Sequence, residues 1–284
     1  MITNIKWLQV EATTKCNAWC PGCYRSQGGY GLNPALVLED LDESVFEQYV
    51  KLMPNLEVID FCGTYGDAIA AYNIKLLTEI AKQYAKKIIV RTNGSLRNAV
   101  WWTQYANILK EHEHEVWFCL DGLADTHSIY RQGTEFNTII DNAKTFMSAG
   151  GTAVWQFIPW KHNEHQIKDC IRLSQQLGFK RFEFIRDVRK EFPFKHYQTG
   201  VELDIQSWQS NAVMNKYEKV RRDIKVDYCR HLAQPSVYLN ANGKISSCCF
   251  FNTELCFDDY NNLPDIAKEL QDTPRAVCIH QCSR

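Results

Sequence analysis

Short runs of apolar residues alternate with longer amphipathic stretches from the start of the chain to about residue 186. Each apolar run is rich in Val, Ile, Phe and Trp and is bounded by Gly, Asn, Asp or Pro, which is typical of a β-strand. The runs are apolar throughout, as expected for strands that are covered on both faces. They predict strands at 5–12, 57–63, 87–93, 115–121, 152–159 and 181–185.

The stretches between these strands repeat their apolar residues at the three-four spacing of an α-helix, most clearly within 73–85. Glycines at 150–151 and at 178 are typical of helix ends. We therefore expect helices near 43–52, 73–85, 99–110, 136–149 and 164–177.

Six strands separated by helices predict right-handed parallel β/α units. Six units are fewer than the eight of a complete barrel, so we expect an α/β fold with a partial (β/α)6 barrel of the TIM type. The active site of such a fold lies at the carboxyl ends of the strands. The predicted division of the chain is a barrel at 1–186, a connector at 187–224 and a small C-terminal domain at 225–284.

The region after residue 186 follows a different pattern, with charged and aromatic residues and one predicted helix at 207–221. The segment SVYLNANGKISSCCFF then predicts a β-hairpin that turns at 240–243, and a helix is expected near 263–271. This tail is too short to form an apolar core of its own. We therefore expect a metal group to stabilise it.

Composition and charge narrow the functional classes. The 284 residues are 45% hydrophobic and 23% charged, as in ordinary globular proteins. The formal net charge is -1, so overall charge does not drive binding to nucleic acid or membranes. No stretch has the 18 or more apolar residues of a transmembrane helix, and the first residues lack the apolar run of a signal peptide. We expect a cytoplasmic protein without a membrane or nucleic-acid partner.

Twelve cysteines are an unusual number for such a chain. A cytoplasmic protein seldom keeps cysteines as disulfides, so grouped cysteines indicate metal ligands or catalytic thiols. One group lies near the start of the chain and another between residues 229 and 282. The three cysteines between the groups are expected to be small buried apolar side chains. These three are Cys62, Cys119 and Cys170.

The first group lies in TTKCNAWCPGCYR, directly after the first predicted strand, and consists of Cys16, Cys20 and Cys23. Structural zinc usually takes four protein ligands, and no fourth Cys or His is nearby in the sequence. Three thiolates on a cubane iron–sulfur cluster leave one iron open, as substrate chemistry requires. The spacing favours such a [4Fe-4S] cluster, with structural zinc as the alternative.

CNAWCPGCY resembles the CxxxCxxC signature of the radical S-adenosylmethionine (SAM) enzymes, including the aromatic residue after the last cysteine. The ends of the next four predicted strands are also similar to segments of this family and occur in the same order. These segments are CGTYGDA (62–68), RTNGS (91–95), FCLDGLADTHSIYRQG (118–133) and WQFIPWKHNEHQ (155–166). The resemblance covers about residues 5–186. It implies that SAM binds the open iron and is cleaved reductively to a 5'-deoxyadenosyl radical, which abstracts hydrogen from the substrate.

The resemblance also implies roles in binding SAM. Either Asp67, where most members have glutamate, or the carbonyls from Gly63 to Tyr65 accept hydrogen bonds from the methionyl amine. Arg131 neutralises the carboxylate, because a guanidinium can bind a carboxylate through two N–H groups. Tyr24 lies against the adenine. The candidates for the ribose hydroxyls are Gln156, Asn93 and, more weakly, Asn163.

The second cysteine group resembles the C-terminal twitch or SPASM extension of the same family, which carries auxiliary iron–sulfur clusters. The complete SPASM pattern has seven cysteines and this region has six, so we expect a twitch-like domain with one auxiliary [4Fe-4S] cluster. Zinc is the alternative, because four thiolates suit it equally. The expected ligands are Cys229, Cys248, Cys278 and Cys282, with Cys249 and Cys256 as alternatives.

The resemblance therefore implies an enzyme of oxidoreductase or transferase type with a reducing partner such as flavodoxin or ferredoxin. Two substrate classes stay open. The first is a peptide or protein side chain; the second is a small polar metabolite (a sugar, aminoglycoside or nucleotide) that is epimerised or dehydrogenated. A third alternative is a cluster-bearing binding or regulatory protein that does not cleave SAM.

Overall fold

The computed structural model describes residues 5–26, 29, 31–110, 113–185, 193–206 and 236–246. Its centre is an eight-stranded sheet in the order β10-β9-β1-β2-β3-β4-β5-β6. Strands β1 to β6 are parallel, and each pairs with the next along the chain. All six predicted strands are thereby confirmed. They span Trp7–Glu11, Val58–Cys62, Lys87–Thr92, Glu115–Cys119, Ala153–Phe157 and Arg181–Phe184.

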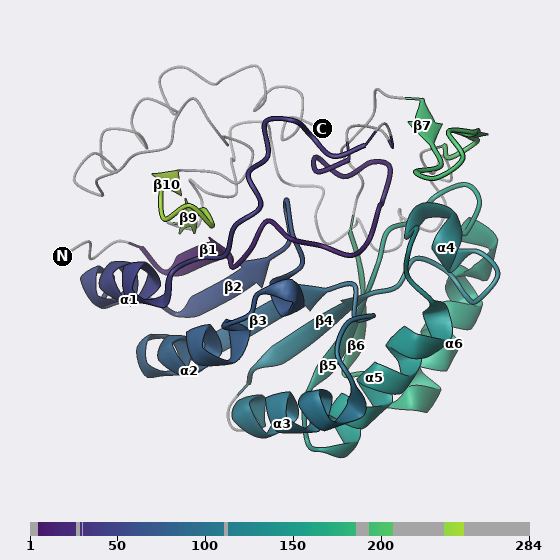
Figure 1. Cartoon of the computed structure of the whole chain (residues 1–284). Coiled ribbons are helices and arrows are strands. Elements are labelled where there is room, and N and C mark those ends of the chain that lie inside the picture. The colour runs from purple at the N-terminus through teal and green to yellow at the C-terminus, as the bar shows by residue number, and fades with distance from the viewer. Residues whose placement is uncertain are drawn as a thin grey trace, which may run out of the picture.

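Five helices cover one face of the sheet, as Figure 1 shows, and each lies between two consecutive strands. All five were predicted, and the last is preceded by a short 3-10 turn at Glu164–Gln166. A single-turn helix, α4, spans His127–Tyr130, and another 3-10 turn spans Ala68–Ala70. The five are α1 (Glu43–Leu52), α2 (Ile74–Tyr84), α3 (Ala99–Leu109), α5 (Phe136–Ser148) and α6 (Ile167–Leu177). The predicted partial α/β barrel is confirmed.

Local sequence signals set the ends of these helices. The side chain of Asp42 caps α1 by accepting from the backbone N–H groups of Ser44 and Val45. Asn98 caps α3 in the same way through the N–H of Trp101. Helix α6 ends at Gly178, whose φ of 87° lies in the left-handed region that glycine adopts without a steric penalty.

Successive residues of each strand face opposite sides of the sheet. In β4, Phe118 packs into the large core between sheet and helices, where aromatic rings such as those of Trp102 and Phe146 interlock. Its neighbour Trp117 faces the other side, in a small apolar cluster that includes Ile89. The helix-covered side is therefore apolar, and the other side is free to carry polar residues toward the carboxyl ends of the strands.

The C-terminal hairpin extends the same sheet. Strand β9 (Ser236–Leu239) pairs in parallel with β1, and β10 (Ile245–Ser246) pairs antiparallel with β9. The N–H of Gly243 donates to the carbonyl of Asn240 at 3.0 Å, which confirms the predicted turn. Val237 and Leu239 are buried in the main core. The sequence analysis placed this hairpin in the C-terminal region 225–284, whereas the structure makes it part of the barrel sheet; the domain division itself stays a prediction.

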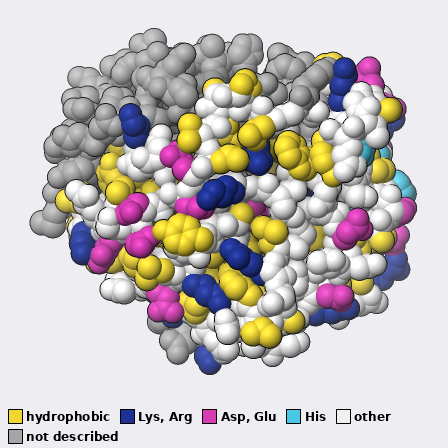
Figure 2. Space-filling model, in the orientation of Figure 1, with side chains coloured by type: hydrophobic (Ala, Val, Ile, Leu, Met, Phe, Trp, Pro, Cys, Tyr) yellow, Lys and Arg dark blue, Asp and Glu magenta, His cyan; other side chains and the backbone are white. Residues whose placement is uncertain are grey.

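A second, two-stranded hairpin lies in the predicted connector, formed by β7 (Phe194–Lys195) and β8 (Glu202–Leu203). Phe194 packs in one cluster with Cys20, and the ring of Tyr197 stacks on Trp19 with centroids 5.5 Å apart. This part of the connector therefore packs against the cysteine loop. On the face in Figure 2, Lys and Arg side chains are interspersed with Asp and Glu.

Within the ranges that the structure describes, none of the helices combines the length and the apolar character needed to span a membrane.

Candidate functional site

A cavity of about 150 Å³ lies at the carboxyl ends of the strands. It is lined by the loop after β1 and by the ends of β2, β3, β4 and β5, together with segments that follow them. Most of the site residues predicted from the sequence meet here. They are Cys16, Cys20, Cys23, Gly63, Tyr65, Asp67, Asn93, Arg131 and Gln156.

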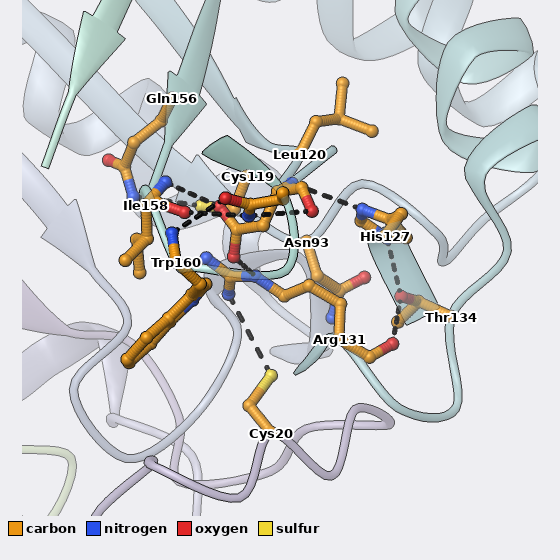
Figure 3. A network of polar contacts seen from close by, with 12 residues as sticks. Cys20, Asn93, Cys119, Leu120, His127, Arg131, Thr134, Gln156, Ile158 and Trp160 are labelled. Atoms are coloured by element: carbon orange, nitrogen blue, oxygen red, sulfur yellow. Dashed lines mark hydrogen bonds and ion pairs between the residues drawn. The ribbon is translucent and has the colours of Figure 1, made fainter. Parts of the chain in front are cut away.

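The three cysteines of the first loop are free thiols, and each approaches a different part of the cavity wall. The side-chain N–H of Asn93, after β3, lies 3.7 Å from the sulfur of Cys16. Arg131, after β4, approaches the sulfur of Cys20 at 3.9 Å, as Figure 3 shows. The thiol of Cys23 donates to the carbonyl of Thr64, after β2, at 3.8 Å. The sulfurs are thus distributed around the cavity.

Arg25 holds the two ends of this loop together, and the sequence analysis did not identify it. Its guanidinium donates to the carbonyl of Thr14 at 2.7 Å and to that of Cys16 at 3.3 Å. The side chain is buried and lines the cavity. The only indication in the sequence was its position directly after the cysteine segment that ends at Tyr24. Arg25 therefore puts a fixed positive charge beside the thiols.

The turn at 63–67 is held tightly against the cysteine loop. A Cβ on Gly66 would lie 1.9 Å from the carbonyl oxygen of Thr13, so only glycine permits this approach. The N–H of Asp67 donates to the carbonyl of Lys15 at 2.9 Å. The segment CGTYGDA, which resembles a SAM-binding segment, therefore packs directly against the cysteine loop.

Asp67 connects the ends of two strands. Its carboxylate accepts from the hydroxyl of Thr92 at 2.8 Å and from the N–H of Asn93 at 2.6 Å, and it caps the following turn through the N–H of Ile69. Burial raises the pKa of Asp67, and these hydrogen bonds oppose the rise. Both of its oxygens already accept hydrogen bonds from the protein. Its predicted contact with a methionyl amine stays a prediction.

Arg131 is fixed by Asp121, a fully buried residue of the segment 118–133 that had no predicted role. Its Nε donates to Asp121 at 2.6 Å, and the other carboxylate oxygen of Asp121 accepts from the N–H of Ile158 at 2.7 Å. Burial lowers the pKa of Arg131, but the Asp121 charge more than offsets this and holds it well above its ordinary value. His127 supports the same turn by accepting from the N–H of Asp121. Arg131 is therefore a permanent cation beside Cys20.

Gln156 belongs to a polar network on the inner side of the sheet. Its carbonyl accepts from Arg91 at 2.7 Å, and its amide N–H lies 3.3 Å from the sulfur of Cys119. Arg91 in turn pairs with Asp60 at 3.0 Å and lies 4.1 Å above the ring of Trp117. The other ribose candidate within the cavity, Asn93, donates to Asn17. Both candidates therefore already have protein partners, and their contact with a ribose stays a prediction.

Two of the predicted residues, Tyr24 and Asn163, lie outside the cavity lining. Tyr24 packs near Tyr65, with ring centroids 6.3 Å apart, and Tyr65 is the ring that reaches the cavity. Asn163 is fully buried, donates to the carbonyl of Ile158 and accepts from the N–H of Trp160. It therefore shapes the loop after β5.

The remaining cysteines divide into two sets. As predicted, the three isolated ones are buried, although Cys119 also lines the cavity. The other six lie outside the described residues, together with the predicted helices at 207–221 and 263–271. These six are Cys229, Cys248, Cys249, Cys256, Cys278 and Cys282.

No protein-family model and no curated protein sequence matches the chain. Solved structures do match. SuiB from Streptococcus suis, bound to S-adenosylmethionine, is 14% identical with a TM-score of 0.66 over 98% of this chain and 68% of SuiB. The structure of anSMEcpe with bound AdoMet is 16% identical, with a TM-score of 0.64 over 95% of this chain and 78% of that one. BtrN in complex with AdoMet and 2-DOIA is 10% identical, with a TM-score of 0.53 over 100% and 89%.

All three of these proteins are radical SAM enzymes. At identities of 10–16%, these matches show the fold of the chain. The chain has the fold of the radical SAM enzymes.

Proposed function

We propose that this protein is a radical SAM enzyme whose Cys16, Cys20 and Cys23 hold a [4Fe-4S] cluster with one open iron. One observation carries the proposal: three free thiols meet a single cavity at the carboxyl ends of parallel strands, beside the fixed cation Arg131. The similar structures with bound SAM support the same assignment.

The donor set fits a cluster. Each thiol contacts the segment that follows a different strand, and the thiolates of a cubane bind different irons. Within the described ranges, no three His, Cys, Asp or Glu side chains gather closely enough to hold a single metal ion. Burial raises the pKa of Cys16, and the nearby Asp67 adds to the rise. Cluster binding must therefore displace a proton from this thiol.

When bound and reduced, the cluster supplies the electron that cleaves SAM to methionine and a 5'-deoxyadenosyl radical. The chain positions SAM for this step. Arg131, which Asp121 fixes at the cavity, would bind the carboxylate of SAM, and the carbonyls from Gly63 to Tyr65 would accept from its amine.

The proposed substrate is a peptide or protein side chain, from which the radical abstracts hydrogen in an oxidoreductase reaction. SuiB has been solved bound to its precursor peptide SuiA, with a TM-score of 0.65 to this chain, and anSMEcpe with a bound Cp18Cys peptide. A small polar metabolite is the alternative, because BtrN has been solved with 2-DOIA. Flavodoxin or ferredoxin in the cytoplasm is the proposed source of electrons.

The decisive experiment is anaerobic reconstitution with iron and sulfide, followed by SAM and dithionite, with 5'-deoxyadenosine as the measured product. Cys20→Ala should lose about four irons per chain and all cleavage of SAM. Cys170→Ala is the matched control, because Cys170 is also buried but lies in α6 outside the cavity. Zinc in place of iron, or no 5'-deoxyadenosine from the wild-type protein, refutes the proposal.

The substrate class is tested with the active protein in deuterated buffer. Candidate peptides and candidate sugars, aminoglycosides or nucleotides are each added and followed by mass spectrometry. Deuterium retained in a product indicates epimerisation, whereas loss of two hydrogens indicates dehydrogenation or crosslinking. Conversion of metabolites alone rejects the peptide proposal.

We also propose that Cys229, Cys248, Cys278 and Cys282 hold one auxiliary [4Fe-4S] cluster that accepts the product electron. Replacing both Cys278 and Cys282 with alanine should leave SAM cleavage intact and stop product formation. If the double variant folds and its turnover is unchanged, the proposed role of the auxiliary cluster as electron acceptor is rejected.

A further inference from the structure

The carboxylate of Glu11, the last residue of β1, is surrounded by donors from one turn. It accepts from the backbone N–H groups of Gly66 at 2.9 Å, Thr64 at 3.1 Å and Tyr65 at 3.3 Å. Its side chain is buried and does not line the cavity. Three consecutive N–H groups that converge on one carboxylate form an anion nest and define the conformation of the turn.

The other side of this turn faces the cysteine loop. The carbonyl of Thr64 accepts from the thiol of Cys23, although the N–H of the same residue points to Glu11. Gly66 lies directly against the backbone of Thr13. The turn is therefore held between Glu11 and the cysteine loop, so a change at Glu11 should shift the surface that faces the cavity.

A residue from the C-terminal hairpin completes the arrangement. The hydroxyl of Tyr238, in β9, donates to the carboxylate of Glu11. Tyr238 is buried and stands opposite Gln9 in the parallel pairing of β9 with β1. The hydrogen bond joins residues 227 positions apart in the sequence.

We propose that Glu11 and Tyr238 are positioning residues for SAM: Tyr238 orients Glu11, and Glu11 sets the turn whose carbonyls receive the methionyl amine. This inference rests on the proposed function and extends it, because it makes the C-terminal hairpin a part of the SAM site. Neither residue touches SAM in this arrangement; both act through the turn.

The charge balance at Glu11 supports this role. Burial raises the pKa of Glu11 to about 7, although the Tyr238 hydroxyl and the three N–H groups each lower it. The carboxylate is therefore kept ionised near neutral pH only with the help of its donors. Removing the Tyr238 hydroxyl favours the protonated carboxyl, which accepts fewer hydrogen bonds from the turn.

The test uses the reconstituted full-length protein and two measurements: the dissociation constant of SAM by calorimetry, and hydrogen exchange of the amides at 63–67. Tyr238→Phe should weaken SAM binding about tenfold, the equivalent of one lost hydrogen bond, and speed exchange in this turn. Glu11→Gln should weaken it about tenfold to a hundredfold, as typical for residues that support a site. Tyr105→Phe is the matched control, because its buried hydroxyl bonds Thr78 between α2 and α3, away from the cavity.

The outcomes separate the two proposals. If wild-type protein does not bind SAM, the proposed function fails. If wild-type protein binds SAM and Tyr238→Phe binds it equally well with unchanged exchange at 63–67, only the present inference is overturned. Equal losses of SAM affinity in Tyr238→Phe and Tyr105→Phe also overturn this inference, because they show that any loss of protein stability weakens SAM binding.

Discussion

The pair formed by Asp121 and Arg131 allows a quantitative test of how the site is built. In Asp121→Asn, the amide oxygen can still accept from the N–H of Ile158, but the amide N–H₂ cannot compensate the guanidinium. Arg131 is then a buried charge without its partner, since its side chain is only 13% exposed. Breaking such a pair from one side costs about 3–5 kcal/mol of the free energy of unfolding. Because Arg131 keeps some contact with water, we expect a loss at the lower end of this range, about 3 kcal/mol.

A loss of this size lowers the melting temperature by about 6–12 °C in a chain of this length. The loss of free energy is measured by anaerobic urea unfolding. The decisive comparison is with the double variant Asp121→Asn/Arg131→Met. Because the double variant leaves no unpaired charge, it should recover at least about 2 kcal/mol relative to Asp121→Asn alone. The exposed pair of Asp169 and Arg172 provides the control: Asp169→Asn should cost less than about 1 kcal/mol.

The same single variant should bind SAM about tenfold more weakly, because Arg131 loses the residue that orients it. An Asp121→Asn protein within about 1 kcal/mol of wild type, or a double variant no more stable than the single one, refutes this account of Arg131 as an oriented cation.

Three further predictions follow from other contacts. Gly66→Ala should bind less iron and SAM than wild type in reconstitution assays, because its Cβ would overlap the carbonyl of Thr13; normal loading contradicts this. Burial raises the pKa of Glu115, but hydrogen bonds, first from Arg181, outweigh burial and lower it to about 2. Its stabilising effect is therefore complete above about pH 5 and is lost as the pH falls through about 2, so Glu115→Gln should cost about 1–2 kcal/mol in urea unfolding at pH 7 and only a small part of that near pH 2. A constant difference across this range contradicts the pairing. Phe146→Ala should cost about 3–5 kcal/mol in urea while leaving SAM affinity unchanged, since this ring fills the core behind the sheet.

Most of the fold could be predicted because the barrel repeats one local pattern. Apolar strand runs and amphipathic helices are properties of neighbouring residues, so β1 to β6 and their helices were found with ends within a few residues. The pairing of β9 with β1 was not predicted, because two short apolar segments far apart in the sequence carry no signal of their register.

The site divides in the same way. The three cysteines and Arg131 were named from segments that resemble a known family, whereas Glu11 and the role of Asp121 were not, because their partners Tyr238 and Ile158 lie far away in the sequence. A signal was available in both cases: each is a carboxylate at the end of an apolar run, where burial requires a partner. Asp67 shows the limit of a motif, since the motif identifies its position but not the hydrogen bonds to Thr92 and Asn93.

The parallel pairing of β9 with β1 also has a consequence for biosynthesis. During translation, the outer edge of β1 has no strand to pair with until residues 236–239 have left the ribosome, when most of the chain has already been made. The nascent protein therefore holds its three N-terminal thiols next to an incomplete sheet for most of the period of synthesis. An unpaired strand edge of this kind can join other chains, so the nascent protein needs protection from aggregation until the last strands of the sheet arrive.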